Sequence, residues 1–550
     1  MKKIKAWLRQ PNRVLWFEYG ALACIIILPL LLPGYILTLD LVFTPHSPFP
    51  SEITNTYFLQ ILLWALNAVL PGDVIEKIIL LAVLLCSGVG MHLLIVKINK
   101  DSLDFWAVAA YFAGLLYMIN PFVYSRFMAG QWMVLLGYAF VPFFVRALYD
   151  FYKTNSLRSA IVASLWAVAI ITVSLHHIGI ITLLGLFFAI AGYIKYRRTP
   201  DLRRFIKRSG LAVLLLVAAT SFWLAPVIMG YGAVAQSVAG MDANHFAAFA
   251  TGGAGVLGPI GEVVRLQGFW AEAQNLFVKP QAIVPGWGII VVLLWILVVA
   301  GAVRAWRTHR AIAAFGMFCV VTGIVLSATP LIEWASGVLP LLGGYREPHK
   351  FASLIALGYA VLGAFGVVAF AKWATVKWGQ AGNKMAMVGV LLLPIIITPV
   401  MFWGFGGQLA PRSYPTEWYE LNADLKTEQS KTVLFLPWHQ YSAYSFSGDR
   451  IIANPAAKFF ENPTIISDDP EFKAISPTRP DQIKRQLSDL LGARDASGLR
   501  DFMNDQKISY IVLAKEQDWQ SYGYIKDIPN LRLVKENDKL LLYKMENVND

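Results

Sequence analysis

Four ionisable side chains fall within five consecutive positions of the stretch GGYREPHKF: Arg346, Glu347, His349 and Lys350. Arginine offers a planar fork of donors and lysine a point charge, a combination suited to binding a phosphate or diphosphate. His349 can add a third charge or a hydrogen bond, and Glu347 can pair with one of the cations. The alternative is an internal salt bridge, from Arg346 to Glu347 or to Glu52, that only stabilises the helix bundle.

Asp40 ends the segment LLLPGYILTLD, at the outer end of the first long apolar run. A carboxylate at a membrane boundary is partly desolvated, which raises its proton affinity and suits it to act as a general base. The alternative is an aspartate that ends a span and is solvated by lipid headgroups. Asp40 is therefore the candidate catalytic residue.

His46 and Glu52 follow in the segment FTPHSPFPSEITN, whose three prolines keep the backbone irregular. Both residues are suitable ligands for a metal ion or a polar substrate. Their spacing matches no strong metal motif, so the metal is unknown and a divalent cation is left open as a cofactor. The alternative is an ordinary rigid loop.

Two further segments add polar groups near the same side of the chain. Arg126 and Gln131 lie in NPFVYSRFMAGQW, which we expect to be a short outer loop, and Arg126 could bind a phosphate or extend to a lipid headgroup. His176 and His177 lie in SLHHIG, between two spans. Successive helical side chains point about 100° apart, so this pair is poorly placed to chelate one ion. The histidines either line a site or form hydrogen bonds within the bundle.

Membrane helices must position these residues. The chain has 550 residues, of which 57% are hydrophobic and 15% charged. Apolar runs of about 20 residues, the length that crosses a bilayer, recur along it. The sequence therefore predicts an α-helical multi-pass membrane protein with about eleven transmembrane helices, near residues 16–39, 74–96, 105–120, 132–149, 159–175, 178–194, 210–231, 284–303, 311–329, 350–371 and 385–405.

The charge distribution predicts the orientation and excludes nucleic acid as the reason for the net charge of +12. From Pro411 onward there are 18 Lys and Arg against 21 Asp and Glu, so the basic excess lies in the membrane part. Alternate loops of that part hold 22 basic residues against 5 in the others. Basic loops are usually cytoplasmic, which places the N-terminus in the cytoplasm, the residues after Pro411 outside the cell membrane, and the GGYREPHKF cations on the outer face. Because orientation does not require cations there, we favour the phosphate hypothesis.

Residues 411–550 differ in character from the membrane domain, 1–410. TVLFLP and KISYIVLAK read as buried strands, PDQIKRQLSDLLGA and LRDFMNDQ as helices, and residues 531–545 as a hairpin. We expect a small extracytoplasmic α/β domain, called the tail domain below. It contains no Gly-rich phosphate loop and no triad spacing. In the first outer loop, TYFLQILLWALNAVLP is too short for a span, and we expect an interfacial helix.

The motifs LDLVFTP, NPFVYSRFMAGQ and REPHKF occur in an order that resembles the membrane core of arabinofuranosyltransferase-D-type proteins, within the wider class of GT-C glycosyltransferases. The counterpart of REPHKF in that family reads Arg-Asn-x-His-Lys-Phe. The resemblance covers most of residues 16–405 as short ordered motifs. The family's long extra carbohydrate-binding modules have no counterpart in these 550 residues, so its acceptor and its pentose donor are not carried over.

The resemblance implies a membrane glycosyltransferase that takes a sugar from a polyprenyl-phosphate donor at the outer face. Asp40 would be the general base that deprotonates a hydroxyl of a cell-envelope glycan, lipid or protein acceptor. Arg346, His349 and Lys350, with Arg126, would offset the charge on the departing polyprenyl phosphate. The donor's lipid tail would lie in a groove between spans, among membrane lipids.

Two other classes of protein stay open as alternatives. A lipid or polysaccharide transporter, or flippase, usually has its site near the bilayer midplane within repeated halves. Here the polar groups gather at one face and the sequence shows no repeat. A non-catalytic membrane scaffold, with the tail domain as an interaction module, is the third class.

Overall fold

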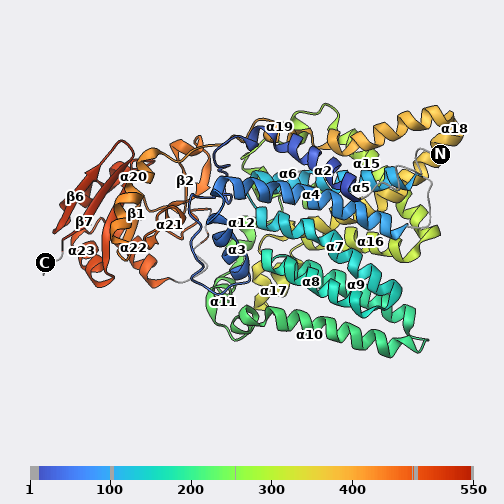
Figure 1. Ribbon diagram of the computed structural model, residues 1–550, viewed down its shortest axis with the longest axis horizontal. Helices are drawn as coiled ribbons and strands as arrows, with labels where there is room; N and C mark the ends of the chain where they lie inside the picture. Colours follow the sequence, from blue (N-terminus) through green and yellow to red (C-terminus); the bar gives the residue numbers. More distant parts are fainter. Residues whose placement is uncertain (1–11, 100–104, 254–255, 473–474, 476–480, 547–550) are drawn as a thin grey trace.

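The computed structural model describes residues 12–99, 105–253, 256–472, 475 and 481–546. A bundle of long helices makes up most of the molecule, and the smaller tail domain caps one end of it (Figure 1). Residues 1–11, which carry most of the basic charge predicted for the cytoplasmic N-terminus, lie outside the described residues.

Nine helical segments of the described chain are long and apolar enough to cross a membrane. The chain is thus a multi-pass membrane protein, as predicted. The helices that form these segments are α2 (Asn12–Ile27), α4 (Gly72–Ile98), α5 (Trp106–Met118) with α6 (Pro121–Met128), α7 (Trp132–Thr154), α9 (His177–Tyr196), α10 (Asp201–Ile228), α15 (Trp287–Thr308), α16 (Arg310–Ala328) and α18 (Ala352–Ile397).

The difference between nine segments and eleven predicted spans arises at two places. Helix α8 (Leu157–Val173) is apolar but has only 17 residues. Helix α18 runs for 46 residues and contains two predicted spans, which are separated by a break at Gly379, where φ is 68°. A positive φ is readily adopted by glycine, so this residue allows the chain to turn between the two parts.

The first part of α18 is the central helix of the bundle, and every residue from Ala352 to Val368 is buried. It packs against α5, α15 and α16. Small residues allow this close approach: a Cβ at Gly301 of α15 would lie 1.8 Å from the Leu362 carbonyl oxygen. Gly366 of α18 meets the Leu297 carbonyl in the same way, at 2.0 Å. Small residues at helix contacts are typical of membrane bundles.

Two sequence predictions about where helices begin and end were wrong. The first span was expected to continue to residue 39, but α2 ends at Ile27 and a short 3-10 turn ends at Leu31. Pro29 and Pro33 lack the amide hydrogens that a continuing helix would need. The segment NPFVYSRFMAGQW was expected to be a loop, but it contains α6, whose N-cap Asn120 accepts a hydrogen bond from Val123 at 3.0 Å.

Short helices form a layer over the end of the bundle that faces the tail domain (Figure 1); the sequence predicts this end to lie outside the cell membrane, and it is called the outer end below. They include α3 (Tyr57–Asn67), α11 (Gly232–Ala239), α12 (Ala243–Phe249), α13 (Gly258–Val263), α14 (Trp270–Ala273), α17 (Leu331–Ser336), the 3-10 turns η3 (Pro340–Tyr345) and η4 (Pro348–Phe351), and α19 (Phe402–Gly406). Helix α3 buries none of its residues and exposes Phe58, Leu62 and Trp64. These exposed apolar side chains agree with the predicted interfacial helix, which would bury them in the membrane surface.

The tail domain contains a five-stranded sheet in the order β4-β1-β5-β7-β6. The strands are β1 (Thr432–Leu436), β4 (Thr464–Ile465), β5 (Ile508–Ala514), β6 (Leu531–Glu536) and β7 (Leu540–Met545). Strand β1 is parallel to β4 and β5, whereas β7 is antiparallel to β5 and β6. The predicted strands, hairpin and helices α22 (Gln482–Ala493) and α23 (Ala496–Asp505) are all present.

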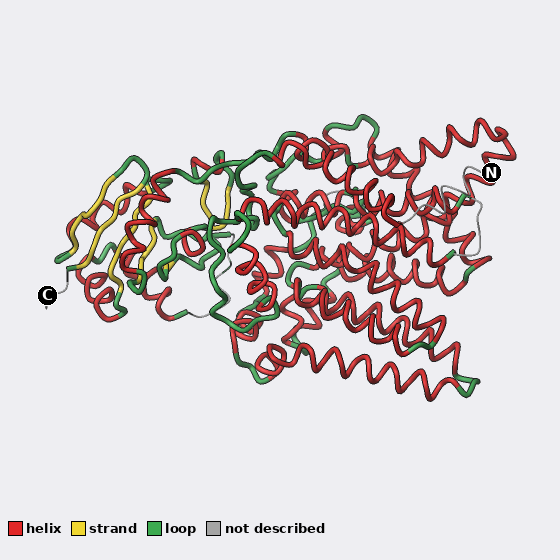
Figure 2. Tube along the Cα trace, in the orientation of Figure 1, coloured by secondary structure: helices red, strands yellow, loops and turns green. Residues whose placement is uncertain are grey.

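Side chains of β1 alternate between two cores, so both faces of the sheet are covered. Leu434 and Leu436 pack with residues of α22 and α23, and Phe435 packs on the other side near Trp418 of α20 (Thr416–Leu425). A separate ribbon, β2 (Tyr441–Ala443) with β3 (Ile451–Ala453), was not predicted. Figure 2 shows this ribbon between the large sheet and the helical bundle. The ribbon therefore brings tail-domain residues to the outer end of the membrane domain.

Candidate active site

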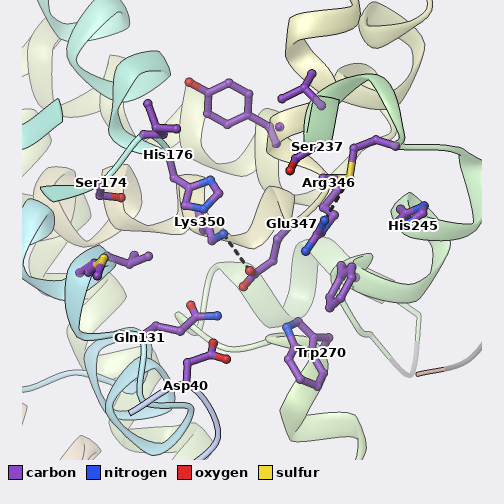
Figure 3. Close-up of a pocket in the computed structure, with 18 of the residues that line it drawn as sticks. Asp40, Gln131, Ser174, His176, Ser237, His245, Trp270, Arg346, Glu347 and Lys350 are labelled. Carbon is purple, nitrogen blue, oxygen red and sulfur yellow. Dashed lines mark hydrogen bonds and ion pairs between the residues drawn. The ribbon is translucent and has the colours of Figure 1, made fainter. Parts of the chain in front are cut away.

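A cavity of about 1600 Å³ lies between the outer end of the bundle and the tail domain. Six of the residues singled out from the sequence line it: Asp40, Gln131, His176, Arg346, Glu347 and Lys350. Figure 3 shows the Asp40 carboxylate directed toward the space that Arg346, Glu347 and Lys350 border from the other side. Segments separated by more than 300 residues are thus brought to one site.

Asp40 lies in a tight turn that the membrane domain holds by its main chain. Thr38 and Leu41 exchange main-chain hydrogen bonds of 3.2 and 2.7 Å, and the Asp40 amide donates to the Ala129 carbonyl at 3.2 Å. Gly130 packs directly beneath, with φ of +69°, and a Cβ there would lie 2.2 Å from the Leu41 nitrogen. The position of Asp40 therefore depends on a glycine at residue 130.

Charged residues at the start of α4 hold the irregular segment that leads to this turn. The buried carboxylate of Glu76 accepts a hydrogen bond from the Ile36 amide at 2.9 Å. Lys77 donates to the Leu32 carbonyl at 2.6 Å and pairs with Asp73 at 2.9 Å. These bonds supply partners for backbone groups that a helix would otherwise have satisfied internally.

The tail-domain ribbon contacts the same turn from the other side. The Leu39 amide donates to the Ile451 carbonyl at 3.1 Å, and the Ala453 amide donates to the Leu39 carbonyl at 2.8 Å. The Tyr441 hydroxyl donates to the Asp40 carboxylate at 2.9 Å. The turn is thus held between the membrane domain and the tail domain.

The Asp40 side chain is exposed to the cavity, and residues of both the membrane domain and the tail domain lie around it. This enclosure raises the pKa of Asp40 because it disfavours the charged form, and the hydrogen bond from Tyr441 opposes the rise. Glu347 adds to the rise and Lys350 counters it. A carboxylate with raised proton affinity and an open face has the properties of a general base.

Glu347 is buried between two cations and so has a structural role. It forms an ion pair with Arg126, which is completely buried, and a second ion pair with Lys350 at 3.0 Å. Burial alone would raise the pKa of Glu347, but the charges of Arg126 and Lys350 overcome it and hold the pKa below the usual range. The predicted internal salt bridge therefore exists, with Arg126 and Lys350 rather than Arg346 as the partners.

Arg126 lies behind the cavity wall and organises its neighbours. It donates to the Gln131 side chain at 2.7 Å and contacts His349 Nδ1 at 2.7 Å, and its guanidinium lies 4.1 Å from the Phe269 ring centroid. His349 Nε2 lies 3.0 Å from the Gln267 carbonyl, so the Nε2 atom must carry the proton and Nδ1 must accept from Arg126. His349 is therefore a neutral ring that does not line the cavity.

Arg346 and Lys350 are the cations that face the cavity. Arg346 contacts the Met241 sulfur at 3.0 Å and lies 4.8 Å from the Phe249 ring centroid. Within the described part of the chain it forms no ion pair, whereas Lys350 shares Glu347 with Arg126. The Arg346 guanidinium thus keeps its charge available for an anion in the cavity.

Three other predicted site residues lie away from the cavity. His46 is exposed and sits 3.6 Å from Glu461 of the tail domain. Glu52 is exposed on the first outer loop. His177 is buried against Gly137 of α7. Of the two adjacent histidines, only His176 lines the cavity, where burial and the charge of Lys350 lower its pKa.

The sequence left a divalent cation open as a cofactor, and the described residues offer no fitting set of donors for one. Within the described ranges, no group of three or more His, Cys, Asp or Glu side chains is placed to hold a metal ion. At the cavity, Glu347 is already bound by Arg126 and Lys350, and Asp40 is bonded to Tyr441.

The wall of the cavity within the bundle is apolar. It includes side chains from α9, α10, α11 and α17 and from η3, among them Leu183, Trp223, Val227, Val238, Ile332 and Leu342. The resemblance in the sequence implies a groove for a lipid tail between spans, and this wall has the chemistry that such a tail requires. The cavity therefore combines an apolar wall with a cluster of charges at its outer end.

Sequence reasoning missed Glu76, Lys77 and Tyr441. The run GDVIEK contains three charges in the first turns of an apolar helix, and charged residues inside a span are a signal of function or of buried structure. Tyr441 gives no such signal, because its role depends on a ribbon that packs on a turn 400 residues earlier in the chain. Only the folded structure brings these residues together.

The long apolar helices, the cavity at one end of the bundle and the small sheet domain define the class of protein by its fold: a multi-pass helical membrane protein with a small α/β domain. No family model and no curated protein matches the chain. The structure of arabinofuranosyltransferase AftD from Mycobacteria aligns with 98% of this chain, with a TM-score of 0.64 and 16% identity. A mutant form of AftD aligns with 97% of it, with a TM-score of 0.63 and 15% identity.

The likeness concerns the fold. The chain spans about two fifths of the length of the AftD chains, 40% and 42% in the two alignments. The oligosaccharyltransferase of Archaeoglobus fulgidus aligns with a TM-score of 0.42 and 10% identity, values too low to carry an argument. The fold expected from the resemblance in the sequence is therefore confirmed for the membrane core.

Proposed function

We propose that this protein is a membrane glycosyltransferase that moves a sugar from a polyprenyl-phosphate donor to an acceptor hydroxyl at the outer face of the membrane. The observation that carries the proposal is the pairing of an exposed carboxylate, Asp40, with two cations, Arg346 and Lys350, across one cavity with an apolar wall. These are the groups that a base, a leaving phosphate and a lipid tail require. The AftD-like fold of the core supports the same class.

In the proposed reaction, the acceptor hydroxyl attacks C1 of the donor sugar while Asp40 accepts its proton. A bond forms between the acceptor oxygen and C1, and the bond between C1 and the phosphate oxygen breaks. The electron pair of that bond remains on the polyprenyl phosphate, whose growing charge Arg346 and Lys350 offset. Asp40 then returns the proton to water.

The first test concerns the base. Asp40→Asn keeps the shape of the side chain but removes its capacity to accept a proton, so release of polyprenyl phosphate from a panel of lipid-linked sugars should fall by on the order of a hundredfold or more. Binding of the donor should change little. Normal turnover in a folded Asp40→Asn protein would exclude Asp40 as the base.

The second test concerns the phosphate. Arg346→Gln and Lys350→Gln should each weaken binding of a short-chain polyprenyl phosphate by about tenfold or more, because each removes a charge-assisted contact. Arg346→Lys should restore the affinity only in part, since the planar fork is lost. The matched control is Arg265→Gln, which removes an exposed outer-loop arginine that does not line the cavity. Equal affinities in all four variants would contradict the phosphate site.

A further inference from the structure

The Asp40 turn contains a strained residue that the tail domain supports. Leu39 has φ of +23°, in the left-handed region that non-glycine residues rarely adopt. Such conformations persist only where the surroundings determine them. Here both main-chain polar groups of Leu39 bond to the β3 strand, to Ile451 and Ala453. The conformation of the turn is therefore coupled to the docking of the ribbon.

The ribbon also contacts the reactive group itself. The hydroxyl of Tyr441, on β2, donates to Asp40 Oδ1 at 2.9 Å. The Asp40 side chain nevertheless stays exposed to the cavity. Gln131 also forms a side-chain hydrogen bond with Asp40. A carboxylate has about four lone-pair sites, so these two bonds leave lone pairs that can accept a proton. The bond from Tyr441 also restricts rotation of the carboxylate, which fixes the direction in which these lone pairs point.

We propose that the tail domain forms part of the active site. The β2–β3 ribbon holds the Asp40 turn in place, and Tyr441 is a positioning residue for the Asp40 carboxylate. This inference rests on the proposed role of Asp40 as the base. It gives the tail domain a function in the reaction, beyond that of a separate module outside the membrane.

The charged surroundings of Asp40 decide what removal of the tyrosine hydroxyl would do. Asp40 interacts electrostatically with three charged groups on the side of the cavity next to η4, namely Glu347, Lys350 and Arg346. From the tail domain, Lys458 interacts with Asp40 in the same way. These groups remain in a Tyr441→Phe protein, and the ring of phenylalanine preserves the packing. The variant therefore removes one hydrogen bond and leaves the other charges in place.

Loss of this bond should raise the pKa of Asp40, because the hydroxyl stabilises the carboxylate more than the protonated acid. The base works only when ionised, so the acid limb of the pH–rate profile should move to higher pH, by about half to one pH unit. The donor is a phosphodiester and does not titrate in this range, so the limb reports on the protein. Rates above the limb should differ much less.

The experiment compares polyprenyl phosphate release against pH for the full-length wild type, Tyr441→Phe and Tyr419→Phe. Tyr419 is a matched control, since it lies in the tail domain, is 42% exposed and does not line the cavity. A shift of the acid limb in Tyr441→Phe alone supports the inference. An unmoved limb, or the same shift in the control, overturns it.

The Asp40→Asn variant separates this inference from the proposed function. If Asp40→Asn retains turnover, the proposed base is wrong. If Asp40→Asn abolishes turnover but Tyr441→Phe leaves the limb unmoved, Asp40 remains the base and only the role of Tyr441 is refuted.

Discussion

The ion pair between Arg126 and Glu347 predicts a large loss of stability when one partner is neutralised. Arg126 is 0% exposed and Glu347 5%, so each charge loses most of its compensation when the other is removed. Removing one partner of a buried pair typically costs about 3–5 kcal/mol, because the remaining charge stays buried. Glu347→Gln would also leave Lys350 without its carboxylate.

The contacts that remain place this variant near the lower end of that range. In Glu347→Gln, Arg126 keeps its hydrogen bond to Gln131 and its contact with the Phe269 ring. The new amide oxygen can also accept one hydrogen bond. We therefore expect a loss of about 3 kcal/mol, measured as the change in unfolding midpoint of the purified protein in detergent.

A matched exposed pair provides the control. Arg532 and Glu546 of the tail domain lie 3.7 Å apart, with side chains 77% and 60% exposed. Exposed pairs contribute about 0–1 kcal/mol, so Glu546→Gln should leave the midpoint almost unchanged. If Glu347→Gln and Glu546→Gln have the same small effect, the assignment of a structural role to Glu347 is refuted.

The ion pairs of Glu347 also predict how their contribution to the stability of the fold depends on pH. The folded-state pKa of Glu347 is held below its usual value by Arg126 and Lys350, against the effect of burial. The stabilisation is therefore complete above the pKa of the unfolded chain and is lost as the pH falls through the lower folded-state pKa. Acid should thus reduce the difference in stability between the wild type and Glu347→Gln.

Two further predictions concern the Asp40 turn and the orientation. Gly130→Ala should abolish turnover, because a Cβ would lie 2.2 Å from the Leu41 nitrogen and φ is +69°; turnover and the unfolding midpoint are measured together, and a fully active variant would contradict the account of the turn. A cysteine introduced at Lys515 should react with an impermeant thiol reagent in intact cells, whereas one at Arg203 should be protected. Protection at Lys515 would reverse the predicted orientation.

The sequence predicted the multi-pass fold and the tail-domain elements because their signals are local. Apolar runs of span length and strands such as TVLFLP are visible in a short window. The same windows failed at α6 and after Ile27, where prolines and caps decide the ends of helices. Helix α6 was read as a loop because its eight residues include polar side chains that are in fact buried against other helices.

The candidate site was only partly predictable for a different reason. The sequence placed Asp40 and the GGYREPHKF cations on one face, and the structure brings them to one cavity. It could not show which of the cations face that cavity. Arg126 is 221 residues from Glu347 in the chain, so their pairing follows from packing and not from any local pattern.

The net charge of this cluster of residues bears on the proposed reaction. Arg126, Arg346 and Lys350 carry three positive charges, and Glu347 offsets one of them, while His349 is held neutral by its two hydrogen bonds. The cluster thus has a formal charge of +2. A donor phosphodiester carries one negative charge, whereas a released phosphomonoester carries about 1.5 to 2 at neutral pH. A cluster with this charge stabilises the departing phosphate more than the bound donor, and only such a difference accelerates the transfer.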